Sequence, residues 1–258
     1  MTDDLSATDI RKRLAGTCWH TVEVVASTGS TNADLVARAG DPDLAGTVRI
    51  TTDQTAGRGR HTRTWEAPPG GQVAISAVLP VTGRTDRLGW LSLGTGIAAA
   101  RGIEAATGVA AVLKWPNDVL VGEKKVAGIL SEFVDTPAGG VAVVGTGINT
   151  GMTPADLPVP TATSLAIETG TAVDVAAVAA GYLRALSALN WPDAVDAIAA
   201  AYRRHCDTLG RAVRLILPTG EVAGTAVDVD AEGRILVVDD AGHRHLAAAG
   251  DVVHLRRA

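Results

Sequence analysis

Cysteine is scarce in this chain of 258 residues, and the two that occur, Cys18 and Cys206, lie far apart. They are too few for a disulfide framework and have no C-x-x-C spacing. Although His20 and His205 lie near them, the spacing matches no standard zinc site, and ordinary core cysteines fit better. A reducing compartment suits this usage.

Long apolar runs are also missing. No stretch of about 18 apolar residues occurs, and the N-terminus has no apolar h-region, so neither a membrane span nor a signal peptide is expected. We therefore expect a cytoplasmic protein without a membrane partner. The formal charge of −5 argues against a protein that coats nucleic acid, since phosphate binding favours a net basic domain.

Lysine is the rarest source of positive charge, and three of the four lysines, Lys114, Lys124 and Lys125, fall in one short segment. Such clustering suggests a place that needs a compact ammonium instead of a guanidinium. A turn that needs solvated charge explains Lys124 well and Lys125 less well. The sequence also lacks G-x-x-x-x-G-K-[ST] and G-x-S-x-G, which excludes a P-loop and a serine-hydrolase elbow.

Hydrophobic periodicity predicts alternating helices and strands over the first 209 residues. Ser30 or Thr31 is expected to cap one helix, and Thr85 or Asp86 a long buried helix that ends at Gly108. Gly122-Glu123 is expected to form a hairpin turn. The predicted helices are 6–15, 31–40, 85–108, 174–189 and 192–207, and the predicted strands are 21–26, 47–52, 72–80, 110–115, 118–121, 125–133 and 141–148.

The sequence pattern changes after Leu209-Gly210, where short runs of alternating apolar and polar residues are separated by PTG, DAEG and DDAG turns. Five short strands in some fifty residues suggest a small β-barrel. We expect a boundary there, with a larger α/β domain over 1–209 and an all-β domain over 210–258.

The first segment with chemical potential is 54–65, QTAGRGRHTRTW. Glycines at 57 and 59 let the backbone approach an anion closely, and Arg58, Arg60 and Arg63 offer planar donors that match carboxylate or phosphate oxygens. We interpret this segment as a flexible anion clamp. A solvated basic loop or a nucleic-acid contact explains three nearby arginines equally well when they are considered alone.

The second such segment is 114–130, KWPNDVLVGEKKVAGIL. Pro116 favours an extended Trp115, so Asn117 and Asp118 are expected where a strand ends and a turn begins. Lys125 opens the returning strand. The alternative is a hairpin whose lysines point into water.

Together the two segments resemble the biotin protein ligase family, whose hallmarks are a G-R-G-R loop and a K-W-P-N-D motif followed by a lysine and A-G-I-L. Further matches are STN at 30–32, Gln54, GTGIN at 145–149 and LGRAV at the start of the predicted barrel. A dinucleotide-binding reading of 145–151 is set aside because Pro154 follows and no helix opens. The ordered set of motifs covers nearly the whole chain.

This resemblance implies a mixed α/β sheet similar to class II aminoacyl-tRNA synthetases. It also implies that the site residues fall into three groups. The residues implied for biotin are Ser30, Thr31, Asn32, Gln54, Arg58, Gly59, Arg60 and Lys125; those for the nucleotide are Arg60, Arg63, Trp65, Asn117, Asp118 and Asn149; and those for catalysis are Lys125, Arg60 and Asp118.

The resemblance further implies ATP and Mg²⁺ as co-substrates, biotin as substrate and a biotin carboxyl carrier domain of an acyl-CoA or pyruvate carboxylase as acceptor. No protein-held metal is expected. Only some twenty-five residues precede the first motif, too few for a winged-helix domain, so DNA binding is not expected. A homodimer is possible. Two rival hypotheses are a lipoate protein ligase and a regulatory binder that holds biotinyl-AMP without transferring it.

Overall fold

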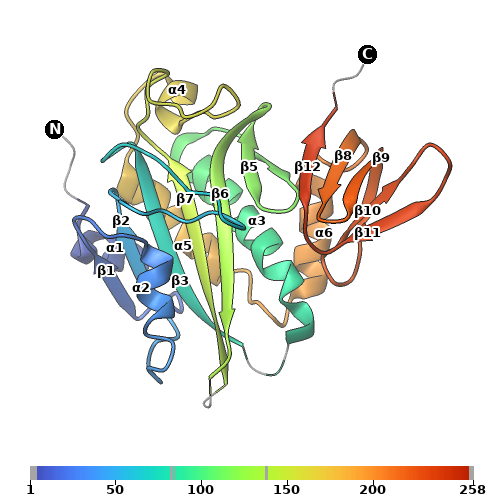
Figure 1. Ribbon diagram of the computed structural model, residues 1–258. Coiled ribbons are helices and arrows are strands. Elements are labelled where there is room, and N and C mark those ends of the chain that lie inside the picture. Colours follow the sequence, from blue (N-terminus) through green and yellow to red (C-terminus); the bar gives the residue numbers. More distant parts are fainter. Residues whose placement is uncertain (1–4, 82, 84, 137–138, 256–258) are drawn as a thin grey trace.

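Two β-sheets make up the framework of the protein. The structure is a computed structural model and describes residues 5–81, 83, 85–136 and 139–255. A seven-stranded sheet has the order β1-β2-β3-β7-β6-β5-β4, and a five-stranded sheet has the order β11-β10-β9-β8-β12 (Figure 1). The helices are α1 (Ala7–Arg13), α2 (Thr31–Val36), the 3₁₀ turn η1 (Thr85–Arg87), α3 (Gly89–Thr107), α4 (Leu165–Thr169), α5 (Val175–Ser187) and α6 (Val195–His205), and the strands are β1 (Thr21–Val24), β2 (Thr47–Thr51), β3 (Gln72–Val81), β4 (Val112–Lys114), β5 (Asp118–Val121), β6 (Lys124–Val134), β7 (Gly140–Asn149), β8 (Ala212–Leu217), β9 (Gly220–Val229), β10 (Ile235–Val238), β11 (Arg244–Ala247) and β12 (Asp251–His254).

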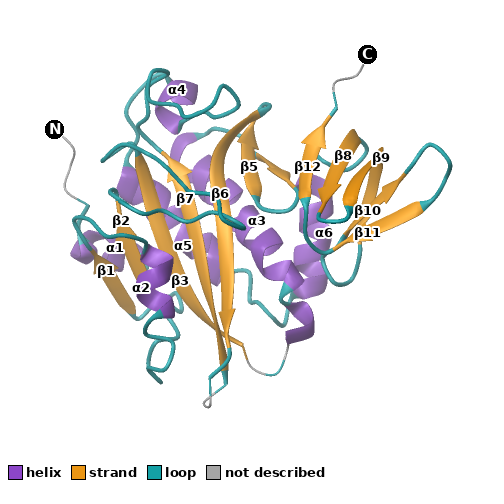
Figure 2. Ribbon diagram, viewed as in Figure 1, coloured by secondary structure: helices purple, strands orange, loops and turns teal. Residues whose placement is uncertain are grey.

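The larger sheet is mixed, because β1 pairs with β2 in parallel and its other ladders are antiparallel. Helices α3 and α5 pack against each other behind this sheet, whereas α2 lies on the front face (Figure 2). The α3–α5 crossing is close: a Cβ on Gly102 would overlap the backbone of Tyr182. The back of the sheet is thereby sealed, and the front is left for a site.

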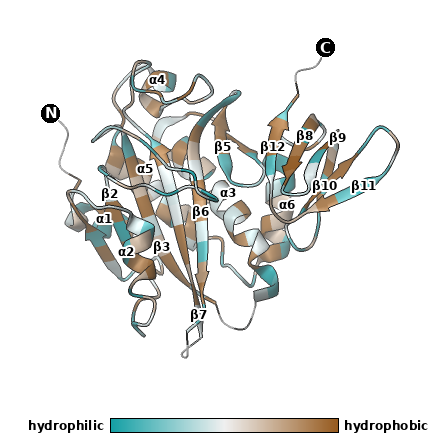
Figure 3. Ribbon diagram, in the orientation of Figure 1, coloured by the Kyte–Doolittle hydropathy of each residue, from teal (hydrophilic) through white to brown (hydrophobic). Residues whose placement is uncertain are grey.

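Burial of the central strands explains their composition. All residues of β3 except Pro80 are buried, which fits a strand that is covered on both faces. Figure 3 shows β3 as largely hydrophobic along its length. Two polar side chains interrupt it, Gln72 and Ser76, and both are fully buried. Buried polar groups in such a strand need partners, and these two lie at the site.

The long helix α3 starts later than its sequence suggests. Thr85 and Asp86 do not cap it, because they form the separate turn η1, and the N-cap position is Leu88. The helix begins at Gly89, where a Cβ would overlap the carbonyl oxygen of Glu232. Trp90 Nε1 donates to the carbonyl of Ala231 at 2.7 Å, so the start of α3 docks on a turn of the smaller sheet.

The five short strands predicted near the C-terminus are confirmed as one antiparallel sheet. Among the described residues its ladder has two ends, β11 and β12, with no pairing between them. The predicted mixed α/β fold is likewise confirmed, while the short helix α4 was not predicted. Cys18 and Cys206 are both free. No helix in the described ranges is long and apolar enough to cross a membrane.

Candidate active site

A cavity with a volume of about 330 Å³ opens on the front of the larger sheet. Both sequence segments singled out above contribute to it, although 48 residues (66–113) separate them. The smaller sheet supplies part of the wall through β8 and β12. Its lining comprises Ser30, Thr31, Asn32, Gln54, Arg58, Gly59, Arg60, Arg63, Thr64, Trp65, Ala74, Lys114, Trp115, Pro116, Asn117, Asp118, Lys125, Gly128, Ile129, Leu130, Gly145, Thr146, Gly147, Ile216, Asp251, Val252 and Val253.

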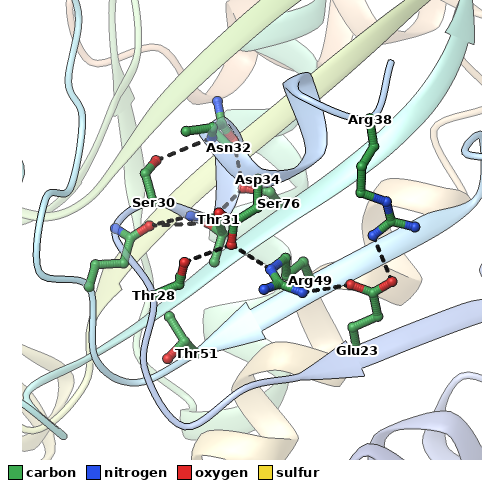
Figure 4. A network of polar contacts seen from close by, with 12 residues as sticks. Glu23, Thr28, Ser30, Thr31, Asn32, Asp34, Arg38, Arg49, Thr51 and Ser76 are labelled. Atoms are coloured by element: carbon green, nitrogen blue, oxygen red, sulfur yellow. Dashed lines mark hydrogen bonds and ion pairs between the residues drawn. The ribbon is translucent and has the colours of Figure 1, made fainter. Parts of the chain in front are cut away.

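The Ser30–Asn32 segment starts α2, and hydrogen bonds with Gln54 and with Ser76 of β3 hold it in place. Ser30 is the N-cap, and its side chain accepts from the Ala33 amide, as expected for a serine at this position. Thr31 donates from its backbone N–H to Gln54 Oε1 at 2.9 Å. Ser76 Oγ lies 2.7 Å from Thr31 Oγ1 and 2.6 Å from Asn32 Oδ1. Figure 4 shows these side chains converging beneath the start of the helix.

A ladder of charges extends this network toward β1 (Figure 4). Asp34 accepts from Thr28 Oγ1 at 2.7 Å and from Arg49 Nε at 2.6 Å. Arg49 and Arg38 each donate to Glu23 at 2.8 Å. Burial raises the pKa of Glu23, but hydrogen bonds from the two arginines outweigh it and hold the pKa below its ordinary value. The ladder fixes the loop that leads into Ser30.

The arginine segment closes on itself as a compact loop. Gly59 N donates to Arg63 O at 2.8 Å, and Trp65 N donates to Gly57 O at 2.9 Å. A Cβ on Gly57 would overlap the carbonyl oxygen of Trp65, so this turn requires glycine. The guanidinium of Arg60 reaches the Gly250 carbonyl at 3.0 Å and Asn117 Oδ1 at 3.4 Å. The loop therefore bridges the two sheets across the cavity.

A β-bulge brings Lys125 into the cavity. The register of β5 on β6 shifts between Val119 and Leu120, so that Asp118 lies opposite Gly128 and Leu120 opposite Lys125. Positions 125 and 128 would face opposite sides of a regular strand, and the extra residue restores them to one side. Lys125 Nζ lies 2.6 Å from Asp118 Oδ1 as a result. The bulge thus places an ammonium next to a carboxylate inside the cavity.

Trp65 rests on a pair of glycines. Gly128 and Gly147 face each other across β6 and β7. A Cβ would come within 2.9 Å of Trp65 Cζ3 at Gly128 and within 2.5 Å of Trp65 Cε2 at Gly147. The ammonium of Lys125 lies 5.4 Å from the centre of the indole, within reach of a cation–π contact. The glycine pair thus makes room for a flat aromatic platform inside the cavity.

Two buried polar atoms next to this platform lack partners among the described residues. Trp65 Nε1 donates to Gln72 Oε1, and Gln72 Nε2 is left without an acceptor. Asn149, which pairs with Gln72 across β3 and β7, has Oδ1 unpartnered while its Nδ2 donates to Thr163 O at 2.9 Å. Buried polar atoms in native folds are nearly always hydrogen-bonded, so a free donor and a free acceptor side by side are an unusual feature of this region.

Each arginine of the loop, and Lys125 across the cavity, lies within salt-bridge distance of a carboxylate. Arg58 pairs with Glu132, Arg63 with Asp251, and Lys125 with Asp118, while Arg60 lies 3.8 Å from Asp251. Burial lowers the pKa of the Arg60 guanidinium, against Asp251 and Asp118, which raise it. An incoming anion therefore meets donors that are already oriented, and it competes with protein carboxylates for them.

The structure brings together almost all the residues predicted from the sequence. All eight of the residues implied for biotin line the cavity, as do Arg63, Trp65, Asn117 and Asp118. Asn149 does not line it and is buried beside Gln72. Sequence reasoning missed Gln72, Ser76, Glu132 and Asp251. Nothing in their local sequence marks them, because each is defined by a contact with a distant segment.

No group of three or more histidine, cysteine, aspartate or glutamate residues that could hold a metal occurs within the described part of the chain. The carboxylates that reach the cavity, such as Asp118 and Asp251, are engaged by cations. Mg²⁺ commonly binds through one or two carboxylates together with substrate phosphates. The donor set fits a magnesium ion that arrives with a nucleotide better than one held by the protein alone.

Comparison with known proteins agrees with this geometry. The sequence profile of the "Biotin/lipoate A/B protein ligase family" matches residues 26–149, and that of the "Biotin protein ligase C terminal domain" matches residues 208–255. The fold and the cavity are therefore those of a cofactor–protein ligase class. The chain is 43% identical to the biotin--[acetyl-CoA-carboxylase] ligase of Mycobacterium tuberculosis over 94% of this chain and 92% of that protein.

A second relative is the biotin--[acetyl-CoA-carboxylase] ligase of Paracoccus denitrificans, which is 35% identical over 88% of this chain and 98% of that protein. Among solved structures, the biotin protein ligase from Aquifex aeolicus in complex with biotin and ATP superposes with a TM-score of 0.76. The match has 26% identity and covers 93% of this chain and 100% of that one. This chain belongs to the biotin protein ligase family.

Proposed function

We propose that this chain is an ATP-dependent biotin protein ligase that forms biotinyl-5′-AMP and then transfers biotin to a lysine of a biotin carboxyl carrier domain. The observation that carries the proposal is the convergence of Arg60 and Lys125, from distant segments, on one cavity of about 330 Å³. This volume lies within the range of small-molecule sites, roughly 300–1,000 Å³. The names of the relatives support the same activity.

We assign biotin to the part of the cavity between α2 and the arginine loop. Ser30 and Thr31 are buried hydroxyls there, and Arg58, Arg60 and Lys125 provide positive charge for a carboxylate. Asn32 is assigned a structural role on the biotin side. Its two amide hydrogens are donated to Leu130 O and Glu132, so it holds the walls instead of donating to the ligand. Gln54 and Gly59 complete the biotin side.

We assign the nucleotide to the platform around Trp65. A base can stack on an indole, and the edge of adenine offers both a donor and an acceptor. Gln72 Nε2 and Asn149 Oδ1, a buried donor and a buried acceptor, match that edge in kind. Arg60, Arg63, Asn117 and Asp118 then lie toward the phosphates.

The first chemical step joins biotin to the nucleotide. A carboxylate oxygen of biotin bonds to the α-phosphorus of ATP, and the bond to the bridging oxygen breaks as pyrophosphate leaves. No general base is needed, because a carboxylate is ionised at neutral pH. Arg60 and Lys125 hold the phosphoryl oxygens where negative charge gathers, while Mg²⁺, when bound, supplies further charge neutralisation on the phosphates.

The second step is attack of the carrier lysine amine on the acyl carbon of biotinyl-AMP, which forms an amide and releases AMP. The amine, with a reference pKa near 10.4, has to lose a proton to react. We propose that Asp118 accepts this proton. In the structure its carboxylate is paired with Lys125 at 2.6 Å, so this role requires Lys125 to turn toward the phosphate first.

The acceptor, assembly and compartment form part of the proposal. We propose a carrier domain of a carboxylase as the acceptor and no role for DNA, and a homodimer would use a free edge of the larger sheet, such as β1. The two free cysteines favour the cytoplasm. We also propose a domain boundary between 209 and 210, supported by the separate C-terminal sheet that begins at Ala212.

One assay tests the proposal. Purified protein is incubated with ATP, Mg²⁺, an apo carrier domain and either biotin or lipoate, and the carrier is measured by intact mass. We expect a mass gain of one biotinyl group with biotin and none with lipoate. A gain with lipoate alone would favour a lipoate ligase. Formation of biotinyl-AMP without any gain on the carrier would favour a regulatory binder.

A further inference from the structure

We propose that Glu132 is a positioning residue that couples the arginine loop to the Ser30–Asn32 segment; this inference rests on the proposed function. Glu132 lies on β6 and none of the sequence motifs includes it. One oxygen of its carboxylate accepts from Asn32 Nδ2 at 2.9 Å, and the other accepts from the guanidinium of Arg58. A single side chain thereby joins two walls of the cavity that are distant in sequence.

The Asn32 end of this link is rigid. Asn32 is 4% exposed, and both hydrogens of its amide are used, one on Leu130 O and one on Glu132. Its Oδ1 accepts from Ser76, which is fully buried. A Cβ on Gly145 would overlap this oxygen, so a glycine opposite makes room for the amide. Glu132 is therefore anchored on a fixed, fully hydrogen-bonded group.

The Arg58 end of the link is adjustable. The Arg58 side chain is 42% exposed and belongs to a glycine-flanked loop, whereas the Glu132 side chain is 24% exposed. A guanidinium has five N–H donors, and the Glu132 contact uses only one side of the fork. Glu132 is the only side chain of the described residues that this guanidinium contacts, so its remaining donors are available while the group is held at the cavity wall. Glu132 thus orients the Arg58 guanidinium and leaves its other N–H groups able to bind an anion.

The coupling has a consequence for the loop. When Arg58 is held by Glu132, the start of the 57–65 loop is fixed to β6, and its other arginines reach β12. Without the carboxylate, Arg58 loses its contact with β6, while Arg60 keeps its contacts with Asn117 and Gly250 and Trp65 keeps its contact with Gln72. We expect biotin to bind more weakly and the loop to open more often, while the rate at saturating biotin changes little.

The test compares Glu132→Gln with Glu221→Gln, which removes an arginine-paired glutamate on β9 that does not line the cavity. Biotin affinity is measured by titration calorimetry, and loop opening by the rate of tryptic cleavage after Arg60 and Arg63, the sites that all variants share, in the presence of biotin and read by mass. For Glu132→Gln we expect an increase of about fivefold in both the dissociation constant and the cleavage rate, as for a partly exposed charged pair. Glu221→Gln is expected to match the wild type.

A double-mutant cycle separates positioning from general stability. If Glu132 acts through Arg58, then Glu132→Gln adds less than about twofold to the effect of Arg58→Gln. Independent effects that multiply would overturn the inference, as would wild-type loop cleavage in either single variant. Because Arg58 is exposed, Arg58→Gln keeps the test valid even if Glu132→Gln unfolds. A wild type that biotinylates its carrier while the cycle shows no coupling would refute this inference and leave the proposed function intact.

Discussion

Lys125 Nζ and Asp118 Oδ1 lie 2.6 Å apart because a bulge in β6 turns both side chains to the same face of the sheet. The neighbouring Lys124 is exposed on the hairpin. Two adjacent lysines thus have different surroundings: one faces a carboxylate and an indole inside the cavity, and the other faces water. This contrast supplies a matched pair of variants.

Lys125→Ala is expected to slow formation of biotinyl-AMP by roughly 100- to 1,000-fold, the usual effect of losing one well-placed donor to a developing negative charge. Lys124→Ala is expected to stay within about twofold of the wild type, as for a surface substitution. Pyrophosphate release under saturating ATP measures both. Equal losses in the two variants would mean that charge near the hairpin matters and the position of Lys125 does not.

Asp118→Asn is expected to slow transfer to the carrier by roughly 100-fold or more if the carboxylate takes the proton of the acceptor amine. The substitution also removes the partner of Lys125, so adenylation has to be measured separately. Supplying preformed biotinyl-AMP in a single turnover isolates the transfer step. An unaltered transfer rate in that experiment would remove Asp118 from the mechanism.

Arg60→Gly is expected to release biotinyl-AMP faster than the wild type, because Arg60 joins the loop to Gly250 O at 3.0 Å and to Asn117 at 3.4 Å. Loss of such charged hydrogen bonds corresponds to roughly a tenfold or greater change in the dissociation rate. Biotinylation of bystander lysines in an added protein reports the leak. If both proteins release the adenylate equally slowly, the loop does not retain it.

Gly147→Ala tests the aromatic platform. A methyl group there would come within 2.5 Å of the Trp65 ring and displace it, and we expect KM for ATP to rise by roughly 5- to 100-fold through lost stacking. Gly40→Ala is the control, because a Cβ at Gly40 meets nothing within 4 Å. An unchanged KM in Gly147→Ala would separate Trp65 from nucleotide binding.

His254 provides a pH-dependent prediction. Burial lowers the pKa of this imidazole below 6.5, with Lys114 and Arg211 acting in the same direction. The unfolded chain then binds the proton more readily, so the free energy of unfolding is undiminished above pH 6.5 and falls as the pH drops below it. The drop in Tm between pH 7 and pH 5 should be smaller in His254→Gln than in the wild type. His243→Gln, at a 75% exposed position, serves as control.

The sequence predicted most elements because local patterns determine them. The spans of β2 and β3 follow from alternation and apolar runs, and Ser30 caps α2 as expected. The predicted start of α3 was wrong, because Thr85 and Asp86 form a separate turn and the helix begins at Gly89, which packs against Glu232 in a contact that no local signal reports. The side chains of Thr85 and Asp86 favour a capping position, but the packing of the whole fold determines where this helix begins.

Part of the site was predicted from the sequence and part was not, again because local patterns report only on consecutive residues. Arginines in a glycine loop and the K-W-P-N-D motif carry their chemistry in consecutive residues. Glu132 and Gln72 act through partners on other strands, and the bulge that aims Lys125 depends on pairing register. The glycines of GTGIN resemble a phosphate-binding loop in the sequence, yet Gly145 makes room for Asn32 and Gly147 for Trp65.

The wall that β8 and β12 contribute to the cavity means that neither sheet encloses the substrates alone. A chain cut between them would yield two fragments that each lack part of the chamber.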